Sequence, residues 1–191
     1  MQSRSNQGCP REFDFALIVG GIDELSPSVM DAMFKAGCDD ATLSIQYGLL
    51  YVEFSRSAPS LKDAILTAIR DVQASKTSAQ VLRVDECNLV TQSDIARRIN
   101  RSRQLVHQYI SGKRGPGGFP PPACHLSDRA PLWPWCAVSY WLVQNSLLRP
   151  EESWNAEVVF AINQCLQEAH QPQEFAELMD DIAKELKAFG V

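Results

Sequence analysis

The sequence lacks the patterns that mark the common enzyme and membrane classes. No apolar run reaches the roughly eighteen residues that a membrane-spanning helix needs. The opening MQSRSNQGCPRE has no apolar core of the kind found in signal peptides, and residues 1–10 are expected to form a disordered leader. GxxxxGK[ST], GxSxG and HExxH motifs are missing, and Gly20-Gly21 lacks the further glycine of a dinucleotide loop. We therefore expect neither an enzyme nor a bound cofactor.

Close cysteine pairs are missing as well. The six cysteines show no CxxC spacing and lie at Cys9, Cys38, Cys87, Cys124, Cys136 and Cys165. This scatter favours reduced thiols in a cytoplasmic protein. Cys124, His125 and Cys136 would make only an incomplete metal site. A second cation site would require two acidic loops to converge, those with Asp23, Glu24, Asp39 and Asp40. Turn and cap roles are commoner for such residues, so no metal is expected.

Positive charge is scarce overall but is concentrated in one segment. The net charge is −5. Residues 91–115 contain six Lys or Arg against one Asp, a local charge of +5, whereas residues 1–90 and 116–191 carry −4 and −6. The acidic whole argues against a nonspecific polyanion coat, yet the basic segment is compatible with a local nucleic-acid surface.

The first part of the chain alternates between strand and helix patterns. Short apolar or alternating runs predict strands at 13–19, on either side of Gly48 and at 81–84. Ser26 with Pro27 begins one predicted helix, and Ser60 precedes a second with apolar residues at helical spacing. The β-α-β-β-α-β order is that of the ferredoxin-like arrangement. We expect residues 11–86 to form an α+β domain for dimerisation or for binding a ligand or partner.

The basic segment predicts two short helices joined by a tight turn. Thr91 is a good N-cap, and Asp94 three residues later completes an approximate capping box. Asn100 tolerates the left-handed conformation that a tight turn needs, and Ser102 caps the second helix. The side expected to be buried comprises Ile95, Ala96, Ile99, Val106, Tyr109 and Ile110.

The opposite side of the second helix carries hydrogen-bonding groups and no acid. These residues are Arg103, Gln104, His107, Gln108 and Ser111. Arginine suits guanine edges and glutamine suits adenine, so the set predicts base reading in the major groove. Arg97, Arg98 and Arg101 lie where phosphates would pass. The alternative is a helical corner with solvated arginines.

The segment QSDIARRINRSRQLVHQYISGK resembles a helix-turn-helix, and its continuation is similar to the winged variant in MerR-type and excisionase-type regulators. The resemblance covers about residues 88–145 and rests on Phe119-Pro120, Leu132-Trp133 and Trp141-Leu142. Arg101 departs from the pattern, in which that turn position is more often aliphatic. The resemblance implies a DNA-binding domain at 88–148, with a wing tip between Ala123 and Ala130. The backbone and wing contacts that it implies are Thr91, Arg97, Arg98, Arg101, Ser102, Lys113, Arg114, His125 and Arg129.

The tail from 150 to 191 predicts an acidic helical hairpin with a break at Gln171-Pro172. One apolar stripe runs through Trp154, Val158, Ile162 and Leu166, and the other through Phe175, Leu178, Met179, Ile182 and Leu186. Such a pair cannot bury both stripes alone, so we expect it to pack on the body or on a second copy.

These observations predict a cytoplasmic, sequence-specific regulator of transcription that binds double-stranded DNA as a homodimer on an inverted repeat. One alternative is an antitoxin-like module whose acidic helices bind a protein partner. Another is RNA binding by the N-terminal sheet, because YGLLYVEF at 47–54 partly matches an RNA-recognition motif. That match has Tyr47 where a basic residue belongs, Leu49 where a stacking aromatic belongs, and Glu53 nearby.

Overall fold

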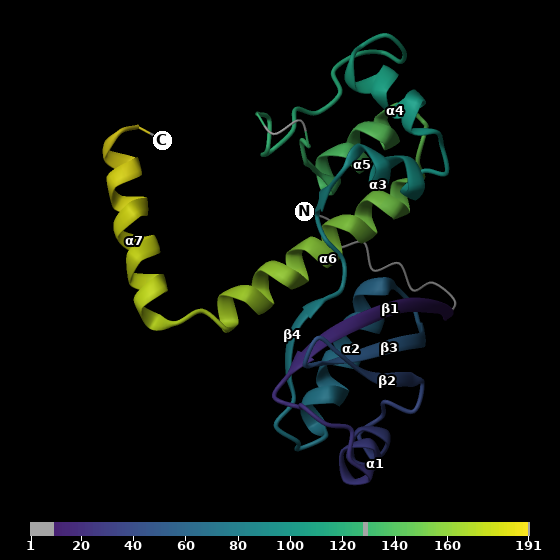
Figure 1. The fold of residues 1–191 in the computed structure, drawn as a ribbon, viewed down its shortest axis with the longest axis vertical. Coiled ribbons are helices and arrows are strands. Elements are labelled where there is room, and N and C mark those ends of the chain that lie inside the picture. Colours follow the sequence, from purple (N-terminus) through teal and green to yellow (C-terminus); the bar gives the residue numbers. More distant parts are fainter. Residues whose placement is uncertain (1–9, 128–129, 191) are drawn as a thin grey trace.

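The computed structural model describes residues 10–127 and 130–190 and has a mixed α+β architecture (Figure 1). The α+β class is confirmed, whereas residues 1–9 of the expected leader and Arg129 lie outside the described residues. None of the described helices is long and apolar enough to span a membrane. The elements are β1 (Arg11–Gly20), α1 (Pro27–Lys35), β2 (Ala41–Gln46), β3 (Leu49–Ala58), α2 (Leu61–Ala74), β4 (Gln80–Val84), β5 (Leu89–Val90), α3 (Gln92–Arg98), α4 (Arg103–Ile110), β6 (Trp133–Pro134), α5 (Trp135–Gln144), α6 (Pro150–Ala169) and α7 (Gln173–Ala188).

A four-stranded antiparallel sheet in the order β2-β3-β1-β4 forms the first lobe. β1 pairs with β3 from Arg11↔Ala58 to Val19↔Leu50 and with β4 on its other side. The β2–β3 hairpin turns at Tyr47 and Gly48, whose φ angles of 52° and 75° are those of a tight two-residue turn. Strand alternation then directs every second side chain of β1 and β3 to the same face.

That face of the sheet is covered by α1, α2 and part of α6 (Figure 1). Ser26 and Ser60 cap α1 and α2 as the sequence predicts, and each accepts a hydrogen bond from a backbone N–H of the first turn. The fully buried core side chains include Leu17, Val19, Met33, Leu50, Val52, Ile65 and Val72. Burial of these side chains is the main stabilising contribution to the lobe.

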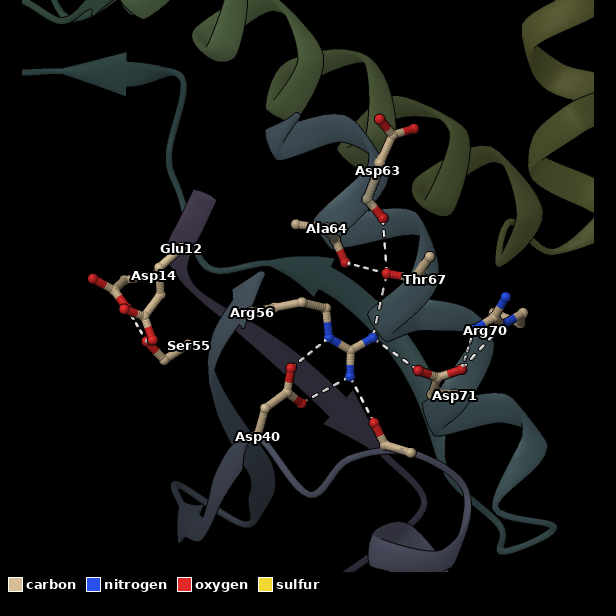
Figure 2. A network of polar contacts seen from close by, with 11 residues as sticks. Glu12, Asp14, Asp40, Ser55, Arg56, Asp63, Ala64, Thr67, Arg70 and Asp71 are labelled. Carbon is tan, nitrogen blue, oxygen red and sulfur yellow. Dashed lines mark hydrogen bonds and ion pairs between the residues drawn. The ribbon is translucent and has the colours of Figure 1, made fainter. Parts of the chain in front are cut away.

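The same face also buries one cation, Arg56 on β3, which is only 7% exposed (Figure 2). Its Nε and Nη2 donate to the carboxylate of Asp40, both at 2.8 Å. Its Nη1 donates to Asp71 at 2.8 Å and to Thr67 at 3.3 Å, and its Nη2 also donates to the Gly37 carbonyl at 2.7 Å. All five guanidinium N–H groups are therefore satisfied, which a buried arginine requires.

The surroundings of Arg56 account for the roles of Asp40 and Cys38. Asp40 is an ion-pair partner of Arg56, so the converging-loop cation site loses one of its expected carboxylates. The described residues contain no cluster of three or more His, Cys, Asp or Glu placed to hold a metal. Burial raises the pKa of the nearby Cys38 thiol to about 11, although the charge of Arg56 acts in the opposite direction. Cys38 is therefore a protonated core residue.

Helix α6 joins the sheet lobe to a second, helical lobe that is formed by α3, α4 and α5. Its Asn163 accepts from the backbone N–H of Val84 at 2.7 Å and donates to the Val84 carbonyl at 3.1 Å. His170 Nε2 lies 2.9 Å from the Val81 carbonyl. These contacts occupy the outer edge of β4, the kind of edge that would otherwise pair with another chain. The other end of α6 buries Ala156 in the second core cluster, beside α5.

The expected helical hairpin does not form. α7 has no buried residue and projects away from α6 (Figure 1). In the stripe expected on α6, Val158 is buried and Ile162 and Leu166 pack against the sheet core, as expected, whereas Trp154 is 59% exposed. Ser153, Ala156 and Val159 of α6 are buried as well. The physical reason is that α6 has better partners than α7, because the polar edge of β4 and the apolar side of α5 both require cover.

The Arg56 network predicts a large difference between two arginines that both contact Asp71. Arg56→Leu leaves the buried carboxylate of Asp71 and the half-buried carboxylate of Asp40 without this cation and should lower the free energy of unfolding by about 3–5 kcal/mol. Arg70→Leu removes an exposed partner of Asp71 and should cost less than about 1 kcal/mol. Urea denaturation of the two variants measures both values. Equal losses would contradict the structural role of Arg56.

The raised pKa of Cys38 predicts selective thiol reactivity. At about pH 8 only about 0.1% of the Cys38 thiols would be ionised, while Cys87 and Cys165 are exposed. A thiol reagent followed by peptide mapping should label Cys87 and Cys165 within minutes and Cys38 only after unfolding. Early labelling of Cys38 in the folded protein would show that the thiol is accessible and ionisable.

Candidate nucleic-acid interface

The two helices α3 and α4 are joined by the tight turn that the sequence predicts. Thr91 Oγ1 accepts from the Asp94 N–H at 3.1 Å, and Asp94 Oδ2 accepts from the Thr91 N–H at 3.0 Å, so the capping box is confirmed. Asn100 has a φ of 51°, and the Arg101 N–H donates to the Ala96 carbonyl at 2.9 Å. Because Ala96 is small, the chain after the turn passes close to α3.

The inner sides of α3 and α4 pack on a core of tryptophans. Ile95, Ala96, Val106 and Tyr109 are buried as expected, and Ile99 and Ile110 are partly buried. Their partners come from β6 and α5 and include Trp133, Trp135, Val138, Trp141 and Leu142. Gln92 adds a polar tie, since its Nε2 donates to the Arg103 carbonyl at 2.7 Å. Short-range patterns in the sequence do not predict this hydrogen bond, because nothing local links Gln92 to the first turn of α4.

The outer side of α4 presents the residues predicted to read bases. Arg103, Gln104, His107 and Ser111 are exposed, and Gln108 is half-buried. Within the described residues, the side chains of Arg103, Gln104, His107 and Gln108 make no hydrogen bond or ion pair, so their polar groups face solvent. Ser102 caps this helix by accepting from the Leu105 N–H at 3.2 Å.

Two arginines beside α4, Arg97 and Arg101, have their guanidinium groups at the surface. Arg97 is 78% exposed along its side chain and pairs with Asp94 at 2.5 Å. Arg101 Nη1 donates to the Asn100 carbonyl at 3.3 Å. The hydrogen bonds from Thr91 lower the pKa of Asp94, and the positive charge of Arg97 acts in the same direction. Both arginines remain available to a second anionic partner.

Arg98 differs from its neighbours and serves the fold. Its Nη1 pairs with Glu86 at 3.0 Å, and its Nη2 donates to the Cys87 carbonyl at 3.2 Å. Its guanidinium also lies 4.8 Å from the ring centre of Trp135. Arg98 thus joins the linker between the lobes to the tryptophan core, and this gives it a role other than the expected phosphate contact.

The glycine–proline run after α4 is held against the core by Trp141. The indole Nε1 of Trp141 donates to the Gly117 carbonyl at 3.0 Å, and its ring meets Phe119 edge-on at 5.0 Å. Gly115 has a φ of 85°, and a Cβ there would lie 3.2 Å from the Tyr109 ring. This loop presents Lys113 and Arg114, both exposed, directly after α4.

A short hairpin follows the glycine–proline loop. The Ala123 N–H donates to the Leu132 carbonyl at 2.8 Å, and the Leu132 N–H donates to the Cys124 carbonyl at 3.2 Å. Trp133 then pairs with Val90 of β5, so the returning chain joins a strand that precedes α3. His125 is exposed in this hairpin, with a φ of 57°. Its expected companion Arg129 lies outside the described residues.

The uncovered face of the four-stranded sheet is acidic. Tyr51 OH donates to Asp85 at 2.9 Å, and this hydrogen bond raises the pKa of Tyr51. Ser55 Oγ donates to Glu12 at 3.0 Å and to Asp14 at 2.7 Å (Figure 2). Carboxylates around one hydrogen-bonded tyrosine make a poor surface for a polyanion.

The capping box predicts a pH-dependent contribution to stability. The pKa of Asp94 is lowered in the folded state, so its stabilising contribution is complete above the unfolded value of about 4 and is lost as the pH falls through the lowered value. Asp94→Ala should cost about 1 kcal/mol at neutral pH and progressively less below pH about 4. Urea denaturation of both proteins across this range tests it. A pH-independent difference would contradict an ionised cap.

The site therefore brings together an exposed polar face on α4, a hairpin and a basic rim, all supported by one tryptophan-rich core. The basic rim consists of Arg97, Arg101, Lys113 and Arg114. It does not bring in Arg98, whose guanidinium is directed to Glu86. Comparison of the chain with models of known protein families, with curated proteins and with solved structures finds no match in any of the three.

Proposed function

We propose that the chain is a sequence-specific double-stranded DNA-binding regulator of transcription whose α4 enters the major groove. The observation that carries the proposal is the outer face of α4, where the side chains of Arg103, Gln104, His107 and Gln108 are uncommitted and no acid is present, in a chain of net charge −5. In a helical corner with a purely structural role, nothing would require the arginines and the lysine to cluster around the outer face of α4. The concentration of positive charge there supports contact with a polyanion.

The proposed architecture is a winged helix-turn-helix preceded by a ferredoxin-like lobe. The order β5, α3, α4, hairpin, β6 and α5 is compatible with the winged arrangement of MerR-type and excisionase-type regulators. The sheet order β2-β3-β1-β4, with two helices on one face, supports the ferredoxin-like assignment of the first lobe. In this reading the hairpin between Ala123 and Leu132 is the wing.

We assign base reading and backbone contact to different groups of residues. Bases are read by Arg103, Gln104, His107, Gln108 and Ser111. Backbone contacts come from the basic rim and the helix N-termini, where Ser102 retains its hydroxyl proton for a phosphate. This second group is Thr91, Arg97, Arg101, Ser102, Lys113, Arg114 and, from the wing, His125 and Arg129.

One recognition helix reads only a few base pairs, so the proposal includes a homodimer on an inverted repeat. Its half-site centres would lie about 34 Å apart, or at a multiple of that distance. The protein would act in the cytoplasm, where the genome of a bacterium or phage is accessible.

An antitoxin-like protein that also binds a partner is the second candidate, and the exposed apolar side of α7 favours it. RNA binding by the sheet is disfavoured by Glu12, Asp14, Glu53 and Asp85.

Selection of binding sites from a random duplex library tests the division of roles. Gln104→Ala and His107→Ala should each relax sequence preference at one position, with a loss of about 1–3 kcal/mol for the preferred base. Lys113→Ala should weaken all sequences about equally and reduce the salt dependence of the binding constant by about one unit. Arg70→Ala is the control, because it removes an exposed arginine on α2.

Two outcomes would overturn the proposal. The first is a wild-type protein that selects no duplex sequence at low salt. The second is a set of variants in which Gln104→Ala, Lys113→Ala and Arg70→Ala behave alike. Measuring single-stranded RNA beside duplex DNA with the same proteins identifies an RNA-binding protein directly.

A further inference from the structure

Within residues 10–127 and 130–190, nothing covers the apolar side of helix α7. It contributes no residue to any core, and six large hydrophobic side chains between 43% and 77% exposed lie on it or directly after it: Phe175, Leu178, Met179, Ile182, Leu186 and Phe189. A solitary helix of 16 residues is marginal in water, because its stability in proteins comes from packing of one face. A partner is therefore required for this helix to persist.

The spacing of the apolar residues is that of a coiled-coil seam. Phe175, Met179, Ile182, Leu186 and Phe189 follow one another at intervals of four, three, four and three residues, which is the a/d pattern of a heptad repeat. One flank of this seam carries Ala176 and Ala183, and the other carries Leu178 and Glu185. The remaining charges lie on the far side of the helix, away from the seam.

The flanking positions favour a second copy of the same helix as the partner. In coiled coils, charges at these positions select between partners, and like charges there oppose self-pairing. α7 has a single charge at the flanks, Glu185, so a net-acidic chain can meet itself without a row of repelling carboxylates. Two alanines on one flank also allow close approach of an identical helix.

Charge along the helix further favours an antiparallel pair. The first half of α7, residues 173–180, carries three acids, Glu174, Glu177 and Asp180, whereas the second half carries Lys184 and Lys187 with Asp181 and Glu185. A parallel pair places three acids beside three acids. An antiparallel pair places each acidic half beside the lysine-bearing half of its partner, which lowers the electrostatic cost of association.

We propose that α7 is a self-association helix that pairs antiparallel with α7 of a second copy. His170 and Asn163 anchor the last turns of α6 to β4, so α7 leaves the body from a fixed point (Figure 1). The pair spans about two heptads and is expected to dissociate in the micromolar range, because seams of this length are marginal alone. The inference does not depend on DNA binding, although it would locate the interface of the proposed dimer.

Sedimentation velocity of the full chain between about 1 μM and about 100 μM tests the proposal. The wild type should approach twice its mass of 21.3 kDa as the concentration rises. The double variant Ile182→Gln, Leu186→Gln should raise the dissociation constant at least about tenfold. The matched control Asp31→Asn, Lys35→Gln removes an exposed ion pair on α1, away from α7, with no change in net charge. It should stay within about twofold of the wild type.

Thermal unfolding monitored by near-ultraviolet circular dichroism shows whether the body stays folded. The seam variant at low concentration should match the wild type, because α7 buries no residue in either core. A wild type that stays monomeric at the highest concentration would overturn the proposal, as would a folded seam variant that dimerises with wild-type affinity. Affinity for a single DNA half-site, measured with the same variants, reports on the proposed function separately.

Discussion

The buried guanidinium of Arg56 is the constraint on which the first lobe depends. A charge at this position is tolerated only because Asp40, Asp71, Thr67 and Gly37 together satisfy every N–H. These partners come from the loop between α1 and β2 and from α2, so one side chain of β3 holds two separate segments in place. The apolar core supplies most of the burial, and Arg56 specifies which arrangement of the segments is compatible with that burial.

The position of the helical lobe depends in turn on that sheet. α6 uses Asn163 and His170 to bind the outer edge of β4, and its first half packs on α5. Arg98 adds a second connection through Glu86 and the ring of Trp135. The candidate interface therefore rests on packed, hydrogen-bonded elements, which suits recognition of bases by side chains that must be held in place.

Much of the local structure follows from short-range rules. The capping box of Thr91 with Asp94, the left-handed Asn100 and the turn at Gly48 are all dictated by neighbours in the sequence, and all three are found where the pattern predicts them. The exposed outer face of α4 also follows from helical spacing, because the buried side of a short amphipathic helix defines its opposite side. What these residues bind stays a prediction, since neither the fold nor the comparisons identify a ligand.

The sequence by itself determined the order of strands and helices, their caps and the clustering of positive charge, because these depend on residues a few positions apart. Tertiary structure decided which polar groups pair at long range. Arg56 finds Asp71 across 15 positions, and Arg98 is drawn to Glu86 although its neighbours Arg97 and Arg101 stay at the surface. It also decided that α6 packs on the body while α7 stays uncovered. Which of these contacts form depends on competition between packing and ion-pair partners that are far apart in the chain. Local sequence patterns therefore do not predict them.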